Sequence, residues 1–153
     1  MKQNKTLATP DGPFRICVED GAVVASGWGA GPDDDGAPVA VMTQATAAVA
    51  AYYAGDFGPA MGVPTQQPGT PFQQAVWQAL RQVPAGATVT YGQLAAIAGR
   101  PRAARAVGSA MAGNAVPLFV PCHRVVKSDG SAGQFAFGTP LKESLLRRER
   151  SLS

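Results

Sequence analysis

The segment TYGQLAAIAGRPRAARAVGSAMAGN, residues 90–114, predicts two short helices joined by a tight turn. Leu94 and Ile97 are spaced as on the inward face of the first helix, which a glycine ends. The second helix is expected to start near Pro101 and to end at Gly113. Two helices with so little chain between them have the arrangement of a helix-turn-helix, a motif found in DNA-binding proteins.

The second of these helices has little side-chain bulk, so a neighbouring helix or DNA could approach it closely. A helix that reads the major groove would offer several Asn, Gln or Arg side chains, whereas an alanine-lined surface with a central Arg105 suits a narrow groove and sequence-independent contact. The residues assigned to DNA binding are Arg105, Ala103, Ala104, Ala106, Gly108, Arg102 and Arg124.

The charge is distributed unevenly along the chain. Residues 1–70 contain three Lys or Arg against seven Asp or Glu, a net charge of −4, whereas residues 71–153 contain ten against three, a net charge of +7. A basic half of this kind favours a polyanionic partner, although arginines that only aid solubility would give the same count.

The composition is that of a globular protein with no membrane partner. The 153 residues suffice for one ordinary domain or two small ones. No apolar run approaches the roughly 20 residues that cross a bilayer, and the start MKQNKTLATPDG lacks the apolar core of a signal peptide, so we expect a cytoplasmic protein. Two cysteines and one histidine are too few for a structural zinc site, so no metal is expected.

Residues 1–66 are expected to form a small domain of antiparallel sheet and helix. Hydrophobic residues alternate as in a strand at Phe14, Ile16 and Val18. Asp-Gly pairs at 11–12 and 20–21 mark turns, and the alanine-rich run at 37–55 predicts a helix that ends in a glycine. Cys17 lies in the strand pattern, where a buried apolar role is expected.

Residues 70–153, after a linker that extends to about 69, are expected to form a second, mainly helical domain. Thr70 and Pro71 are typical of a helix start, and the hydrophobic residues of PFQQAVWQALRQV share one face. The predicted fold class is therefore α/β, with a small sheet-and-helix domain followed by a helical domain that contains the helix-turn-helix.

The segment PLFVPCHRVV, residues 117–126, places Cys122 directly before His123, the only histidine. A thiol is a good nucleophile only as the thiolate, which needs a base, a cation or a helix N-terminus nearby. Neighbouring side chains usually point apart, so His123 could act on Cys122 only through a bridging water or a backbone reversal. The alternative is a buried thiol beside a surface imidazole.

The region from Thr70 to Glu149 resembles the O6-alkylguanine-DNA alkyltransferases, also called methylated-DNA–protein-cysteine methyltransferases. The resemblance rests on TYGQLAAIAG, RAVGSAMAGN, VPCHRVV and LKESLLRRE, in this order, whereas residues 1–66 match only in general plan. It implies a single-turnover transfer of an alkyl group to Cys122, without a cofactor, from O6-alkylguanine or O4-alkylthymine flipped out of duplex DNA.

The resemblance also implies individual roles. His123, acting through water, would remove the thiol proton, and Glu149 would orient His123. Asn114 would hold the turn before the cysteine, Tyr91 would donate to N3 of the leaving guanine, and Arg105 would fill the gap left by the flipped nucleotide. The substrate pocket would be lined by Tyr91, Val125, Phe135, Ala136 and Phe137.

Two positions depart from the family pattern. Where relatives have a loop of the form GxYxGG, this chain reads GQFAFG, so Phe135 replaces a tyrosine and Phe137 replaces a glycine. The ring of Phe137 is expected to narrow the pocket and to favour methyl over bulkier alkyl groups. Ala115 replaces the proline that usually follows the asparagine, which should loosen the hinge slightly.

Three other functions compete with alkyl transfer. A damage binder of the same fold would flip the alkylated base without chemistry, but such relatives typically have tryptophan at the cysteine position. A helix-turn-helix regulator would have no use for the PCHR segment. A cysteine hydrolase would need an oxyanion hole and a histidine in contact with the thiol. For the alkyltransferase we expect a monomer whose affinity for DNA falls as the salt concentration rises.

Overall fold

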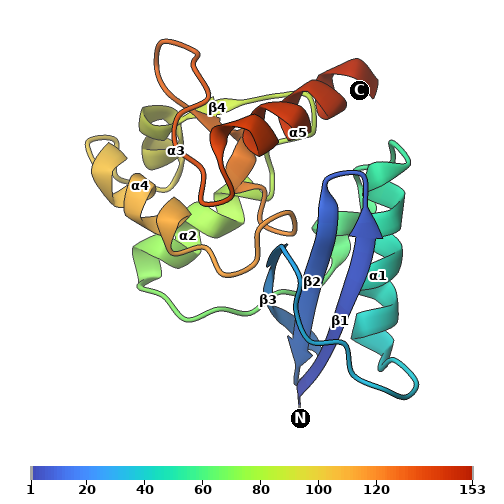
Figure 1. Ribbon diagram of the computed structural model, residues 1–153. Helices are drawn as coiled ribbons and strands as arrows, with labels where there is room; N and C mark the ends of the chain where they lie inside the picture. Colours follow the sequence, from blue (N-terminus) through green and yellow to red (C-terminus); the bar gives the residue numbers. More distant parts are fainter. Residues whose placement is uncertain (1, 153) are drawn as a thin grey trace. The chain divides into compact units, whose positions relative to one another are not determined.

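The computed structural model describes residues 2–152, and the chain divides into two compact units (Figure 1). The first unit consists of residues 1–67 with 115–119, and the second of residues 68–114 with 120–153. Both begin with elements that the hydrophobic patterns predict. The return of residues 115–119 to the first unit has no counterpart in those patterns.

The first unit contains a three-stranded antiparallel sheet whose strands are neighbours in chain order. The strands are β1 (Lys2–Thr9), β2 (Gly12–Glu19) and β3 (Ala22–Trp28). The predicted turn between β2 and β3 is confirmed: Asp20 and Gly21 both have positive φ, 51° and 79°, as a tight two-residue hairpin requires. Cys17 lies in β2, half-buried and with a free thiol.

Helix α1 (Ala40–Tyr53) packs along one face of this sheet (Figure 1). Its buried face consists of Val41, Met42, Ala45, Ala48, Val49 and Tyr52. The predicted glycine end is confirmed, because Gly55 follows the helix with φ +97°, a conformation that other residues rarely adopt. A short 3-10 helix, η1 (Pro59–Gly62), comes next.

Residues 115–119 are tied to β3 by hydrogen bonds. The backbone N–H of Ser26 donates to the Ala115 carbonyl at 3.0 Å, and its hydroxyl donates to the Pro117 carbonyl at 2.8 Å. The ring of Phe119 lies 6.3 Å from that of Phe14 in the same core. The segment shortly before Cys122 is therefore anchored in the first unit.

The second unit is mainly helical. Its elements are α2 (Pro71–Leu80), β4 (Val89–Thr90), α3 (Tyr91–Ile97), α4 (Ala104–Ala112), η2 (Cys122–Arg124), β5 (Val125–Val126) and α5 (Thr139–Leu152). The two short strands pair in parallel, which places the start of α3 beside the chain that follows the Cys-His pair. The predicted start of α2 is confirmed: the Thr70 hydroxyl accepts from the Gln73 N–H at 3.1 Å in a capping box.

The helix-turn-helix is formed by α3 and α4, but two details differ from expectation. Ile97 is 62% exposed, because Leu94 and Ala95 are the buried residues and a helix turns Ile97 about 110° away from their midpoint. Helix α4 starts at Ala104, later than expected near Pro101, since the turn extends to the residue before it.

None of the helices in residues 2–152 has both the length and the apolar composition that crossing a bilayer requires. Across the same described range, no three His, Cys, Asp or Glu side chains are grouped so as to hold a metal ion.

Gly108 lies in the middle of α4, where no neighbouring element requires a glycine. A Cβ atom added to it would have no atom of another element within 4 Å. We expect Gly108→Ala to raise the free energy of unfolding by about 1 kcal/mol, because alanine loses less backbone entropy in a helix. Urea denaturation measures this change, and an unchanged or lower value would show that α4 tolerates no side chain here.

Candidate active site

Cys122 and His123 lie in the tight turn η2. The Cys122 N–H donates to the Val120 carbonyl at 2.8 Å, and the turn sends its three side chains in different directions because successive residues of a 3-10 helix differ by about 120°. Cys122 is 8% exposed and His123 is 0% exposed. The alternative of a surface imidazole is therefore wrong.

His123 is held by Glu149 of α5. The two side chains approach at 2.5 Å between Nε2 and Oε2, and both are buried. Burial favours the neutral acid, but the hydrogen bond with His123 and the hydrogen bonds and positive charge of Arg124 outweigh it and lower the pKa of Glu149 to about 2. The carboxylate is therefore ionised at neutral pH and can only accept hydrogen bonds.

Arg124 completes this cluster from the opposite side. Its Nε donates to Oε1 of Glu149 at 2.8 Å, its Nη2 donates to Oε2 at 3.2 Å, and its Nη1 donates to the Val83 carbonyl at 2.8 Å. Arg124 is only 1% exposed. The prediction that Arg124 contacts DNA is wrong, because its guanidinium group neutralises a buried carboxylate.

These contacts determine the protonation of His123. Burial lowers its pKa, with the charges of Arg124 and Lys142 acting in the same direction and Glu149 opposing them, so the ring is neutral at pH 7. Because an ionised Glu149 must receive the proton of Nε2, the Nδ1 atom has a free lone pair. Nδ1 is buried and has no hydrogen-bond partner among the described residues. It is the nitrogen that can act as a base.

Opposing effects act on the pKa of the buried Cys122 thiol. Burial raises its pKa, whereas a hydrogen bond from the Asn114 side chain, the charge of Lys142 and backbone N–H groups lower it. The Asn114 Nδ2 atom also donates to the Val120 carbonyl at 3.0 Å, so this side chain links the end of α4 to the turn before the thiol. The resting form is a protonated thiol that its surroundings help to ionise.

Sequence reasoning missed Lys142, the residue that supplies this charge. Lys142 is 1% exposed and its Nζ donates to the Gln134 carbonyl at 3.2 Å. Burial lowers the pKa of Lys142, and a Cys122 thiolate would raise it again. A signal was present, since Lys142 lies three and seven residues before Leu145 and Glu149 and therefore shares their buried helix face.

Tyr91, the first residue of α3, is half-buried near the loop at 133–138. A Cβ atom added to Gly133 would make an ordinary contact with its hydroxyl oxygen at 3.4 Å, so the loop passes close to Tyr91, and the φ of +77° at Gly133 is one that favours glycine. Burial and the charge of a Cys122 thiolate both raise the pKa of Tyr91. Its hydroxyl therefore stays protonated and can donate a hydrogen bond.

The remaining residues predicted for the substrate pocket differ in exposure. Phe135 and Phe137 are half-buried and contact edge to face, with ring centroids 5.6 Å apart. Ala136 between them is exposed, whereas Val125 is 0% exposed and pairs with β4. The two phenyl rings thus form one unit within the loop that passes Tyr91.

The residues predicted to contact DNA, apart from Arg124, lie on the open side of α4 and the turn before it. Arg102, Ala104 and Arg105 are exposed, and Ala103, Ala106 and Gly108 are half-buried. Helix packing uses other residues: Val107 and Ala110 are buried, and Trp77 Nε1 of α2 donates to the Ala110 carbonyl at 3.0 Å. The small residues on the other side of α4 are therefore not needed for packing within the protein, and they form a surface with little side-chain bulk.

We expect Glu149→Gln to lower the free energy of unfolding by about 3–5 kcal/mol, because it leaves the buried charge of Arg124 uncompensated. The matched control is Glu143→Gln on the exposed face of the same helix, which should change stability by less than about 0.5 kcal/mol. Urea denaturation of both variants provides the comparison. Equal stability of the two variants would mean that the buried charge of Arg124 does not need Glu149 as its counter-ion.

Comparison with known proteins matches residues 71–151 to the family model of the 6-O-methylguanine DNA methyltransferase DNA-binding domain. The methylated-DNA–protein-cysteine methyltransferase of Salmonella typhimurium is 50% identical over 101 residues, which are 66% of this chain and 59% of that protein. The human protein of the same name is 48% identical over 91 residues, which are 60% of this chain and 44% of that one. The chain thus spans less than two thirds of these relatives.

The similarity in structure extends further along the chain. The crystal structure of Mycobacterium tuberculosis OGT in complex with DNA superposes with a TM-score of 0.84 at 32% identity, over 99% of this chain and 94% of that one. The similarity therefore includes residues 1–67 of the first unit, which the family model does not cover.

Proposed function

Because this chain belongs to the 6-O-methylguanine DNA methyltransferase family, we propose that it repairs DNA by moving an alkyl group from O6 of guanine to its own Cys122. The observation that supports this most directly is the buried thiol next to a neutral histidine whose Nε2 is bound to Glu149. The structure of the M. tuberculosis relative in complex with DNA supports DNA as the partner. O4-alkylthymine is a second expected lesion.

The proposed reaction is an in-line displacement in which His123 Nδ1, through a water molecule, takes the thiol proton. The Cys122 sulfur then bonds to the alkyl carbon as the bond from that carbon to O6 breaks, and the electron pair remains on guanine. Tyr91 donates a hydrogen bond to N3 of the guanine and stabilises its developing negative charge. Lys142 and Asn114 favour the thiolate before the attack.

Transfer produces a thioether, and none of the groups assigned here can hydrolyse it. Each molecule is therefore expected to act once, as a methylated-DNA–protein-cysteine S-methyltransferase without a cofactor. The second unit would contain both the chemistry and the DNA-binding surface. We also propose that the protein acts as a monomer in the cytoplasm.

DNA is expected to bind along the open side of α4. The thin surface at Ala104 and Gly108 suits the minor groove, and exposed Arg105 is placed to fill the space of a flipped nucleotide. Arg102 would contact a phosphate. Arg124 has no part in this surface, because it is buried against Glu149.

The test is mass spectrometry after mixing the protein with duplex DNA that contains one O6-methylguanine. We expect a gain of about 14 Da on the peptide that contains Cys122, saturating near one group per chain. Cys17 is an internal control that should stay unmodified, and Cys122→Ala should bind the duplex without any gain in mass. Tight binding by the unaltered protein without a mass gain would instead identify a damage binder.

A second prediction concerns the loop GQFAFG. We expect Phe137→Gly to raise the rate of transfer from O6-benzylguanine relative to O6-methylguanine by about tenfold, because a glycine leaves room for the larger group. Phe135→Tyr is the matched control, since it restores the usual hydroxyl without changing the size of the ring. An unchanged ratio of benzyl to methyl transfer in Phe137→Gly would show that Phe137 does not narrow the pocket.

A further inference from the structure

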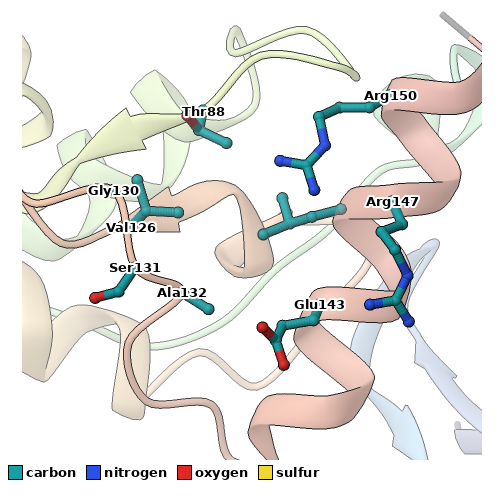
Figure 2. Close-up of a pocket in the computed structure, with 9 residues that line it drawn as sticks. Thr88, Val126, Gly130, Ser131, Ala132, Glu143, Arg147 and Arg150 are labelled. Atoms are coloured by element: carbon teal, nitrogen blue, oxygen red, sulfur yellow. The ribbon is translucent and has the colours of Figure 1, made fainter.

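The second unit has a separate pocket beside α5 (Figure 2). Its volume is about 330 Å³, and it lies between α5, Thr88, the end of β5 and the turn at 130–132. This volume is at the lower end of the range for small-molecule sites, about 300–1,000 Å³. The residues that line it do not include Cys122, His123 or Tyr91.

The apolar part of the pocket is formed by Val126 and Leu146, both 6% exposed, together with half-buried Ala132. Neither of the two larger side chains has a polar group. The middle of the pocket therefore favours a flat or apolar group of a ligand.

Two arginines on α5 supply positive charge at the pocket. Arg147 and Arg150 are one turn apart and exposed, and neither makes an ion pair with a carboxylate of the described residues. Figure 2 shows the guanidinium group of Arg150 reaching from the helix toward Thr88, whose hydroxyl is a further donor. This end of the pocket is suited to a phosphate group, which guanidinium donors bind in a forked geometry.

The side of the pocket away from Arg150 contains a carboxylate, and Figure 2 shows the guanidinium group of Arg147 turned toward this side and away from Arg150. Glu143, one turn before Arg147 on the same helix, lies near Ala132 in Figure 2 and has no ion-pair partner among the described residues. An ionised carboxylate accepts hydrogen bonds through two oxygens and donates none. A ligand that satisfies the whole pocket must have an anionic end, an apolar middle and an end with N–H donors.

We propose that this pocket binds a guanine nucleotide, either a free mononucleotide or the terminal nucleotide of a DNA strand. The phosphate contacts Arg150 and Thr88, the base lies over Val126 and Leu146, and the base N–H groups donate to Glu143. Guanine fits best because its N1–H and its amino group are adjacent donors that match the two carboxylate oxygens. Adenine has an unprotonated ring nitrogen beside its amino group, which would repel Glu143.

This proposal does not depend on alkyl transfer, because the pocket contains no residue of the proposed reaction. It is tested by titrating the ¹⁵N-labelled protein with dGMP, dAMP and inorganic phosphate and following its NMR spectrum. We expect the amide signals of Gly130, Ser131 and Ala132 to shift, with dGMP binding about tenfold more tightly than dAMP or phosphate.

Variants locate the two ends of the ligand. Arg150→Ala should weaken dGMP binding about tenfold, and Glu143→Gln should remove the preference for dGMP over dAMP. The matched control is Arg102→Ala, which removes an equally exposed arginine from the α4 surface and should leave dGMP binding unchanged. A short strand that begins with a 5′-phosphorylated guanine, compared with the same strand without the phosphate, shows whether strand ends also bind.

Three results would overturn the proposal. Equal affinity for dGMP, dAMP and phosphate would reduce the pocket to a general anion site. Loss of binding in Arg102→Ala but not in Arg150→Ala would place the nucleotide on the α4 surface. Absence of shifts at residues 130–132 with millimolar dGMP would show that the pocket takes no nucleotide.

Discussion

The second unit depends on one buried carboxylate. Glu149 accepts hydrogen bonds from His123 at 2.5 Å and from Arg124 at 2.8 Å and 3.2 Å, and its side chain is 1% exposed. A charge in such a place is stable only when it is neutralised and its lone pairs are occupied. Helix α5 can therefore pack only when the Cys-His-Arg turn is correctly formed, so the packing that completes the unit also orients the histidine. The stability of the unit and the orientation of His123 therefore have the same physical origin.

The same arrangement sets the opposing effects on the pKa of the Cys122 thiol. Burial alone would keep Cys122 protonated and inert, whereas the Asn114 side chain and the charge of Lys142 lower its pKa. Lys142 projects from the same helix face as Glu149, so α5 supplies both the anion that orients the base and the cation that favours the thiolate. A permanently ionised thiol would be open to oxidation, and a fully apolar site would not react. The surroundings of Cys122 lie between these two cases, because they keep the thiol protonated at rest but include groups that favour the thiolate.

Local patterns predicted most of the elements, because their causes lie within a few residues. The capping box at Thr70, the hairpin at Asp20 and Gly21, and the glycine that ends α1 each require only neighbouring chain. The predictions failed where packing against other segments determines which residues are buried or where the chain runs. Ile97 follows the expected spacing but is exposed, because the buried face of α3 centres on Leu94 and Ala95. The return of residues 115–119 to the first unit rests on hydrogen bonds with Ser26, about 90 positions away.

The sequence by itself determined the set of chemical groups: a cysteine next to the only histidine, a helix of small residues flanked by arginines, and motifs specific enough to indicate a family of DNA alkyltransferases. Only the tertiary structure decided what each charge does. Arg124 looked like a DNA contact and is an internal counter-ion, and Lys142 looked like an ordinary helix lysine and lies near the thiol. Nδ1 of His123 keeps a free lone pair because Glu149 accepts the proton of Nε2. The reason is physical: the protonation and the partner of a buried charge depend on groups that lie close in space, and here those groups are about 20–30 positions apart in the chain.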